Sequence, residues 1–296
     1  MQRSRGYTIL EVMIFLAVSA ALLGAAINLV TGRQRQVTFD QSVRDTQSKL
    51  QDWINDVATG FTGGDPSQQH CTLGSGSRPV VDNGAPSATA TPDCVFLGKA
   101  IQFTDTTQSA NQSGTLYAYS VFGSRLAANG DLATNLADSN PIAATGQESS
   151  GNADLTESFS LAPAQVTSVV SSAIIPTTPN PKQSAYTDSH LIGFFNSFNT
   201  EQSSTENGSE DVNAYQFDFD GSSFTPGDQS GGAALRECLQ LTSGACKTPN
   251  AYDNTMWPER LQSLKVCLSD GKYSALITIT SNNGLGASVN FDYESC

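Results

Sequence analysis

The sequence carries six cysteines, and their spacing favours disulfide bonds over a metal site. No two of them form a C-x-x-C pair, and the sequence has only two histidines, His70 and His190. Zinc sites usually need closer cysteine pairs or nearby histidines, so disulfides in an oxidising compartment are the better interpretation. The alternative is that one or more cysteines are buried free thiols. Loop lengths favour three pairings: Cys71–Cys94, Cys238–Cys246 and Cys267–Cys296.

Sequence motifs for catalysis are missing. The sequence has no G-x-S-x-G, P-loop, G-x-G-x-x-G or H-E-x-x-H motif, and neither histidine sits in a recognisable catalytic pattern. We therefore expect no enzyme, no catalytic residue and no cofactor. An anchored or secreted enzyme is the least supported class.

Two groups of side chains could form binding sites, but a structural role is favoured for both. The carboxylates of Asp218, Asp220 and Asp228 could attract calcium. Their spacing fails an EF-hand loop, whose first and twelfth positions would be Gln216 and Gly227, so acidic hairpin edges are favoured and no metal is expected. The second group could form a binding surface, yet alternate residues of a strand more often belong to the core: Tyr117, Tyr119 and Phe122.

The overall charge bears on possible partners. The chain has 296 residues with a formal charge of −13 and a pI of about 4.4. A nucleic-acid surface needs a basic stripe, so we expect no nucleic acid to bind over the whole surface. A local basic patch would escape this argument.

A single acid, Glu11, precedes a long apolar segment. From Val12 to Thr31 the sequence has 20 residues without a charge, and only Asn28 is clearly polar. As a helix this segment would measure about 30 Å, one hydrocarbon thickness. A carboxylate at membrane depth is costly and is usually paired or functional. The alternative is an interfacial acid whose carboxylate snorkels to the membrane surface.

The orientation of this span follows from the cysteines rather than from the flanking charges. Arg3 and Arg5 precede the span while Arg33 and Arg35 follow it, so the basic residues are balanced. Cysteines that form disulfides follow the span, which places the N-terminus in the cytoplasm and the bulk of the chain outside. A signal peptide cut within 17–20 and a plain single-pass anchor are the alternatives.

The stretch "RGYTILEVMIFLAVSAALL" resembles the N-terminus of type IV prepilins and pseudopilins. The resemblance implies a leader from Met1 to Gly6. It also implies that a membrane-embedded aspartyl peptidase cuts between Gly6 and Tyr7 and methylates the new N-terminus at Tyr7. Glu11 would then be the acid that pairs with the N-terminal amine of the neighbouring subunit during assembly.

The resemblance covers about 25 residues and has two departures. Tyr7 stands where the family usually has Phe, and the span lacks the helix-breaking proline of many pilins, for which Gly24 is the nearest substitute. Ser19, Ala20 and Gly24 approximate the small-residue spacing that lets helices pack closely. Ordinary membrane helices also show such spacing.

The family implies partners and a location: prepilin peptidase, other pilin subunits, an ATPase-driven assembly platform in the inner membrane, and the cell membrane itself. The chain would be a single-pass membrane protein that reaches the cell surface when assembled in a pilus. A minor pilin of the type IV pilus is favoured because the head is large. A type II secretion or competence pseudopilin and a membrane-anchored surface adhesin are the alternatives.

The fold class expected is α+β and pilin-like, a long N-terminal helix packed on a mainly antiparallel β head with long loops and disulfides. The organisation is a leader at 1–6, a membrane or filament-core helix at 7–31, its amphipathic continuation at 32–60 and an extracytoplasmic head at 61–296. One helix face recurs at helical steps: Val43, Leu50, Ile54, Val57 and Phe61. Trp53 flanks that face, and Gly60 is the expected C-cap. The opposite, solvated side carries Arg44, Asp45, Lys49 and Asp52.

The head sequence predicts strand pairs. Residues 94–104 are expected to pair with 115–123, and 190–198 with 214–225. Within 214–225, Asp220-Gly221 is a hairpin-turn signal. The chain ends in an antiparallel meander of 261–269, 273–280 and 287–293. Its turns are Asp270-Gly271 and Asn282-Asn283-Gly284.

Three stretches lack a clear pattern and are expected to be mainly loops. Residues 82–93 form a loop closed by the Cys71–Cys94 bridge, and 200–213 form a surface loop. Within 129–188 the only strong element is 164–174.

Overall fold

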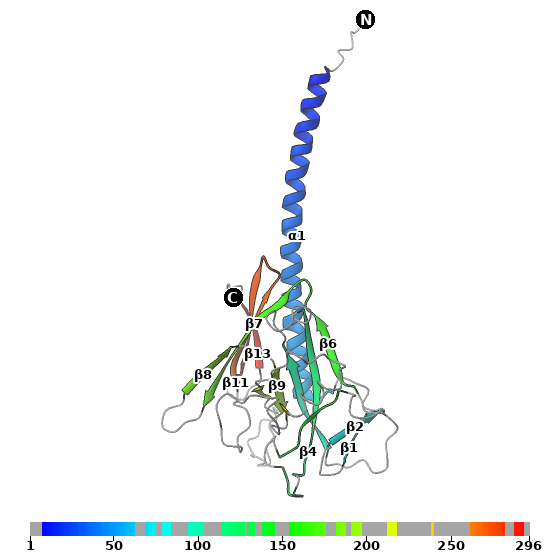
Figure 1. Ribbon diagram of the computed structural model, residues 1–296, viewed down its shortest axis with the longest axis vertical. Coiled ribbons are helices and arrows are strands. Elements are labelled where there is room, and N and C mark those ends of the chain that lie inside the picture. The colour runs from blue at the N-terminus through cyan, green and yellow to red at the C-terminus, as the bar shows by residue number, and fades with distance from the viewer. Residues whose placement is uncertain are drawn as a thin grey trace.

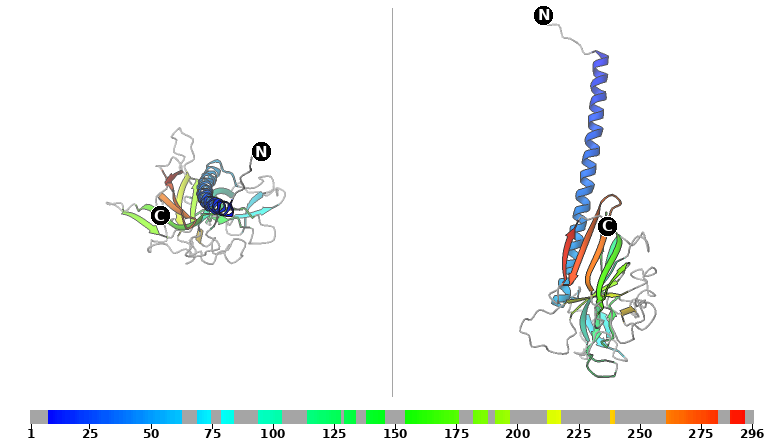
Figure 2. Two further views of the ribbon diagram at one scale, coloured as in Figure 1. Left: turned by 90° about the horizontal axis from the view of Figure 1, so that it is seen from above. Right: turned by 90° about the vertical axis from the view of Figure 1, so that its left-hand side faces the viewer.

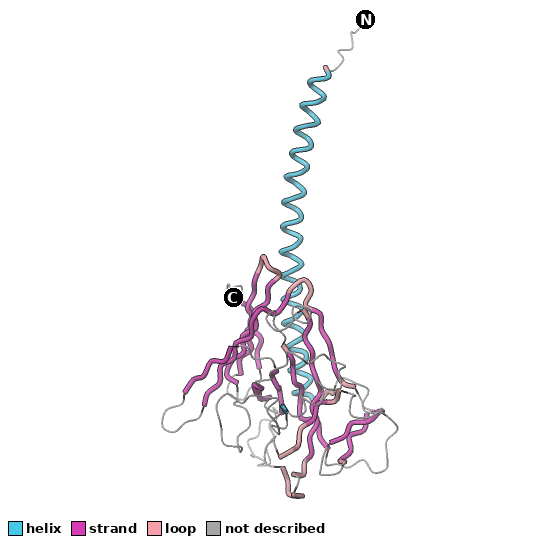
Figure 3. The backbone as a smooth tube through the Cα atoms, viewed as in Figure 1, coloured by secondary structure: helices cyan, strands magenta, loops and turns pink. Residues whose placement is uncertain are grey.

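The computed structural model describes these residues of the chain: 8–62, 69–74, 79–83, 94–103, 114–127, 129–133, 138–145, 154–175, 182–187, 191–196, 212–217, 238–239, 261–281 and 287–292. One long helix projects from a head of antiparallel strands (Figure 1). The tube in Figure 3 shows a helix in the N-terminal part of the chain and strands in the head. The predicted α+β fold class is confirmed.

Helix α1 (Ile9–Thr59) is continuous over 51 residues. At 1.5 Å per residue it is about 77 Å long. Its interior contains no proline, and Gly60 ends it in the left-handed conformation at φ 73°, where its N–H bonds back to the carbonyls of Asp56 and Val57. A glycine in this position satisfies the last carbonyls without Cβ strain. The predicted C-cap is confirmed.

The head contains two main sheets. The first has the strand order β10-β9-β3-β4-β5, with β6 also paired to β4. Its pairs among β3, β4, β9 and β10 are antiparallel, as expected from hairpin connections and a shared core. The bounds are β3 (Cys94–Gln102), β4 (Thr115–Ser124), β5 (Ile142–Ala143), β6 (Thr156–Ser160), β9 (Leu191–Asn196) and β10 (Val212–Phe217).

The second sheet has the order β13-β12-β11-β7-β8 and is antiparallel throughout its described pairs. A separate hairpin pairs β1 (Gln69–Leu73) with β2 (Pro79–Asn83). The bounds of the second sheet are β7 (Gln165–Ile175), β8 (Lys182–Thr187), β11 (Leu261–Ser269), β12 (Ser274–Ser281) and β13 (Ala287–Asp292).

Most of the predicted strands are present. The pairs β3–β4 and β9–β10 and the C-terminal meander are confirmed, and Gly271 supplies the left-handed turn between β11 and β12 at φ 83°. The turns predicted at 220–221 and 282–284 lie outside the described residues. The loop predictions were wrong in part, because β2 reaches Asn83, β10 begins at Val212, and 129–188 also holds β5, β6 and β8.

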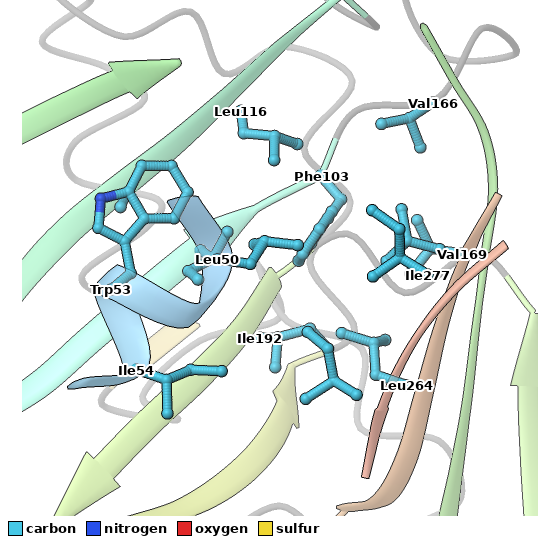
Figure 4. Packing of buried hydrophobic residues seen from close by; sticks show 14 of the residues in the cluster. Leu50, Trp53, Ile54, Phe103, Leu116, Val166, Val169, Ile192, Leu264 and Ile277 are labelled. Atoms are coloured by element: carbon cyan, nitrogen blue, oxygen red, sulfur yellow. The ribbon is translucent and has the colours of Figure 1, made fainter. Parts of the chain in front are cut away.

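The main core lies where α1 meets both sheets (Figure 4). Leu50 and Ile54 of the helix face Ile192 and Phe103 of the first sheet region, while Val169, Leu264 and Ile277 close the core from the second sheet. A second buried cluster covers the other face of the first sheet. It is built of residues such as Tyr119, Phe195, Phe217, Cys238 and Leu239.

The predicted buried face of the helix is confirmed, with three corrections. Val43, Leu50, Ile54 and Val57 are buried, but Phe61 is 48% exposed because the chain has left the helix at Gly60. Trp53 does not merely flank the face, since it is fully buried. Lys49 does not lie in solvent, because it is half-buried in an ion pair; the predicted solvated side is otherwise correct for Arg44, Asp45 and Asp52.

A buried polar network fastens α1 to the first sheet. The ammonium group of Lys99, a β3 residue that is 1% exposed, donates to Asp56 Oδ2 at 2.7 Å and to Glu157 Oε1 at 2.5 Å. The other carboxylate oxygen of Glu157 accepts from Trp53 Nε1 at 2.8 Å and Lys49 Nζ at 2.9 Å. Each buried charge is thus paired, as burial in a low dielectric requires.

The network depresses the pKa of Glu157. Burial by itself raises the pKa of this carboxyl, but hydrogen bonds from Lys99, Trp53 and Lys49 favour the charged form and bring the pKa down from 4.5 to about 2. A carboxyl whose folded pKa is lowered contributes stability that is complete above its unfolded pKa and is lost as the pH falls toward the folded pKa. The window for Glu157 therefore runs from about pH 4.5 down to about pH 2.

We expect Glu157→Gln to lower the free energy of unfolding by about 3 kcal/mol at pH 7, because the variant loses the charge that Lys99 and Lys49 bind. Denaturant titration of the full chain in detergent, monitored by tryptophan fluorescence, measures this. The difference from wild type should shrink as the pH falls from 5 to 2. Lys49→Gln, which removes a more exposed partner, is the matched control and should cost less than about 1 kcal/mol. Equal stability of Glu157→Gln and wild type at pH 7 would contradict this assignment.

Candidate functional site

The first turn of α1 places Glu11 in a defined position. Thr8 is the N-cap with extended backbone at φ −75° and ψ 148°, and its hydroxyl oxygen accepts from the backbone N–H of Glu11 at 3.3 Å. Thr8 followed three residues later by Glu11 matches the capping-box pattern. The negative carboxylate thus lies at the positive end of the helix dipole. Sequence reasoning missed this cap, although the T-x-x-E spacing signals it.

The half of α1 that follows is uncovered. None of the residues in the apolar window is buried within the described structure, and the window is long and apolar enough to cross a membrane. Figure 2 shows this part of the helix standing clear of the head. Among the described side chains of α1, the large apolar ones exposed by at least 46% are Ile9, Leu10, Val12, Met13, Ile14, Phe15, Leu16, Val18, Leu22, Leu23, Ile27, Val30 and Val37.

Two threonine hydroxyls in this region bond to the helix itself. The hydroxyl of Thr31 donates to the carbonyl oxygen of Ile27 at 3.0 Å, and that of Thr38 donates to Gln34 at 2.9 Å. Such bonds to the preceding turn remove the cost of placing a hydroxyl in an apolar medium. Charged side chains begin again at Arg33.

The contacts between the head and α1 that lie nearest the apolar span form a set that we call the collar. The guanidinium of Arg35 donates from Nε to Asp270 Oδ2 and from Nη2 to the Asp270 carbonyl, both at 2.7 Å. One turn further, the rings of Phe39 and Tyr273 lie 6.1 Å apart. The hydroxyl of Ser42 donates to the carbonyl of Leu161. The collar thus consists of Arg35, Phe39, Ser42, Leu161, Asp270 and Tyr273.

Asp270 is a well-stabilised carboxylate of the collar. Burial raises its pKa, but the backbone N–H of Tyr273, the guanidinium of Arg35 and the backbone N–H of Lys272 hold the pKa below its usual value. Its side chain is 2% exposed. The Asp270 carboxylate therefore fixes the β11–β12 turn through the two backbone N–H groups, and it joins this turn to α1 through Arg35.

The collar follows directly after the apolar span. From Glu11 to Arg33 the helix rises about 33 Å, close to the thickness of a bilayer hydrocarbon core. Arg35 lies about 3 Å further along the axis. The head therefore begins where the charge-free segment ends, without a spacer.

The structure locates some of the predicted site residues and not others. Gly6 and Tyr7 precede the described residues, whereas Glu11 lies in the first helical turn. The Cys71–Cys94 disulfide is confirmed, with Cα atoms 5.7 Å apart. Cys238 and Cys267 are also disulfide-bonded, but their predicted partners lie outside the described residues: Cys246 and Cys296.

The other candidate binding groups stay without a site in the described part of the chain. Tyr119 and Phe122 are buried in the core and Tyr117 is half-buried, as the core interpretation predicted. Burial also raises the pKa of Tyr119, whose hydroxyl donates to Gln102 Oε1 at 2.7 Å. Among the described residues no three potential metal ligands gather, and the acidic residues at 218, 220 and 228 lie outside them.

Comparison with known proteins identifies the N-terminal segment. Residues 1–27 match the model of the prokaryotic N-terminal methylation motif. The match includes Gly6, Tyr7 and Glu11, and the chain therefore carries a type IV prepilin-like signal. No curated protein matches the chain. No solved structure matches it either.

Two exposed apolar side chains of equal accessibility test whether the uncovered half of α1 enters a membrane. Leu23 is 63% exposed and Val37 is 64% exposed. We expect Leu23→Arg to raise the fraction of the chain that is released from membranes, because an arginine in mid-span costs about 3 kcal/mol. Val37→Arg, beyond the span, should stay anchored. Extraction of cell membranes with alkaline carbonate measures the released fraction, and equal release of both variants would contradict the span.

Proposed function

We propose that this chain is a structural subunit of a type IV pilus-like filament, made as a membrane-anchored precursor and processed by prepilin peptidase. One combination of features supports this proposal above all others. A methylation motif at residues 1–27 runs into a charge-free helix that the head leaves uncovered, and that helix has one carboxylate in its first turn. A helix of this kind can exchange lipid for the apolar helices of neighbouring subunits.

Glu11 is proposed to direct assembly through its charge. Cleavage after Gly6 would create a cationic amine at Tyr7, four residues before the carboxylate. In a helical bundle the Glu11 carboxylate of one subunit would pair with the N-terminal amine of the next. Both charges would then be satisfied in an apolar core, where an unpaired charge is strongly unfavourable. The pair would also select the axial register of an incoming subunit.

The head favours a minor subunit. It follows a helix ending at Thr59 and extends to residue 296, and a head of this bulk is hard to repeat at every position of a close-packed lattice. We therefore propose a minor pilin that is placed rarely or at the tip, with no enzymatic role. A type II secretion or competence pseudopilin is the alternative assembly. Deletion of the gene, scored for surface pili and for protein secretion, separates the two.

Processing of the N-terminus is the first test. We expect the chain isolated from its own host to lack Met1–Gly6 and to begin with N-methylated Tyr7, because residues 1–27 carry the recognition motif. Mass spectrometry of the N-terminal peptide measures both changes. The same chain from a strain without prepilin peptidase is the control and should retain the leader. An intact Met1 in the presence of the peptidase, or a cut near Ala20, contradicts the proposal.

Substitution of the acid tests assembly separately from membrane insertion. We expect Glu11→Ala to remain membrane-anchored but to fall at least about tenfold in filaments, because the N-terminal amine loses its buried partner. Leu10→Ala is the matched control, because it shortens a side chain in the same turn without removing a charge, and it should assemble. Immunoblots of sheared filaments and of membranes from the same cells give the two amounts. Wild-type incorporation of Glu11→Ala would refute the role of the acid.

A further inference from the structure

Three cations surround α1 at the level where it leaves the head, and we call them the basic rim: Arg33, Arg35 and Lys272. Arg33 and Arg35 are two residues apart, so they point to nearly opposite sides of the helix. Arg35 is held by Asp270 while its side chain stays 51% exposed. Lys272 belongs to the adjoining β11–β12 turn, where its Nζ lies 5.1 Å from the centroid of the Tyr273 ring.

The basic rim stands out against an acidic chain. Within residues 31–39 and 269–273, the charged side chains are these three cations and the single carboxylate of Asp270, a net charge of +2. The whole chain carries −13. The other head turn beside the emerging helix, residues 161–164 between β6 and β7, is uncharged (Figure 1). Asp40, one residue beyond this window, and Asp292, which pairs with Leu276 at the end of β13, are the next acids, so the positive excess is confined to the level of the rim itself.

The axial position of the rim coincides with a membrane surface. Arg33 follows the charge-free segment 12–31 by two residues, and that segment is about 30 Å long as a helix. When the segment fills a bilayer, the basic rim must lie at the level of the lipid headgroups on the side of the head. Cations at this level are attracted to anionic phospholipids.

We propose that the basic rim seats the head on anionic phospholipid headgroups while the subunit waits in the membrane before assembly. This inference rests on the membrane insertion within the proposed function, and it adds a ligand class and the residues that bind it. The collar supports the seating, because Asp270 and Arg35 lock the turn that carries Lys272 onto the helix. When the span lies in the bilayer, the head is therefore held at a fixed position against the bilayer surface.

Lysine labelling in nanodiscs tests this contact. The full chain is placed in nanodiscs of pure phosphatidylcholine and in nanodiscs that also contain phosphatidylglycerol, at about 0.1 M salt. A water-soluble amine reagent then labels the lysines, and peptide mass spectrometry gives the rate at each site. We expect Lys272 to react about threefold more slowly in the anionic nanodiscs, since its amine is shielded from the reagent where it contacts the anionic headgroups. The effect should disappear in 1 M salt, where the Debye length is about 3 Å.

Lys265 provides an internal control, because it is exposed on the same β-hairpin but lies about 16 Å from the turn. Its rate should be the same in both lipids. Arg33→Gln should reduce the protection of Lys272, whereas Lys265→Gln should leave that protection intact. Equal Lys272 rates in the two nanodiscs, or a parallel change at Lys265, would overturn the lipid contact. Failure of the chain to enter either nanodisc would overturn the membrane insertion as well.

Discussion

The two halves of the unbroken helix α1 need two different surroundings. From the collar onward, the head covers one face of α1, where residues such as Phe39, Val43 and Leu50 are 1% exposed or less. The half before the collar exposes apolar side chains whose burial is worth about 1.5–3 kcal/mol each. Water cannot be the resting environment of that half. A bilayer and a bundle of similar helices both meet its need.

The head is fastened to the helix at two levels, and these contacts give the uncovered half a fixed direction. The Lys99–Asp56–Glu157 network holds the far end, and the collar around Arg35 and Asp270 holds the near end. Because α1 continues without a break from the collar to its first turn, the direction of Glu11 relative to the sheets is set by these contacts. The position of Glu11 against a neighbouring subunit would then also set how the heads of the two subunits pack.

The sequence predicted the elements whose patterns are local. Residues within a few positions of one another determine each of these elements: the charge-free run, the helix face around Leu50 and Ile54, the cap at Gly60 and the β11–β12 turn. The short strands β5, β6 and β8 lack such a pattern, because their pairing depends on partners elsewhere in the chain. Glu157 illustrates the limit. Nothing in "TESFS" marks it as the acceptor of Lys99, Trp53 and Lys49, since those donors come from α1 and β3.

In the proposed filament the Glu11 carboxylate of one subunit contacts the N-terminal amine of its neighbour, and this contact can be tested by chemical cross-linking. A carbodiimide joins a carboxylate to an amine only where the two are in contact. Isolated filaments treated with this reagent and digested would show the result by mass spectrometry. We expect a peptide in which Glu11 is linked to the N-terminal residue of another subunit. Filaments that contain the chain but yield Glu11 only in unlinked, reagent-modified form would contradict it.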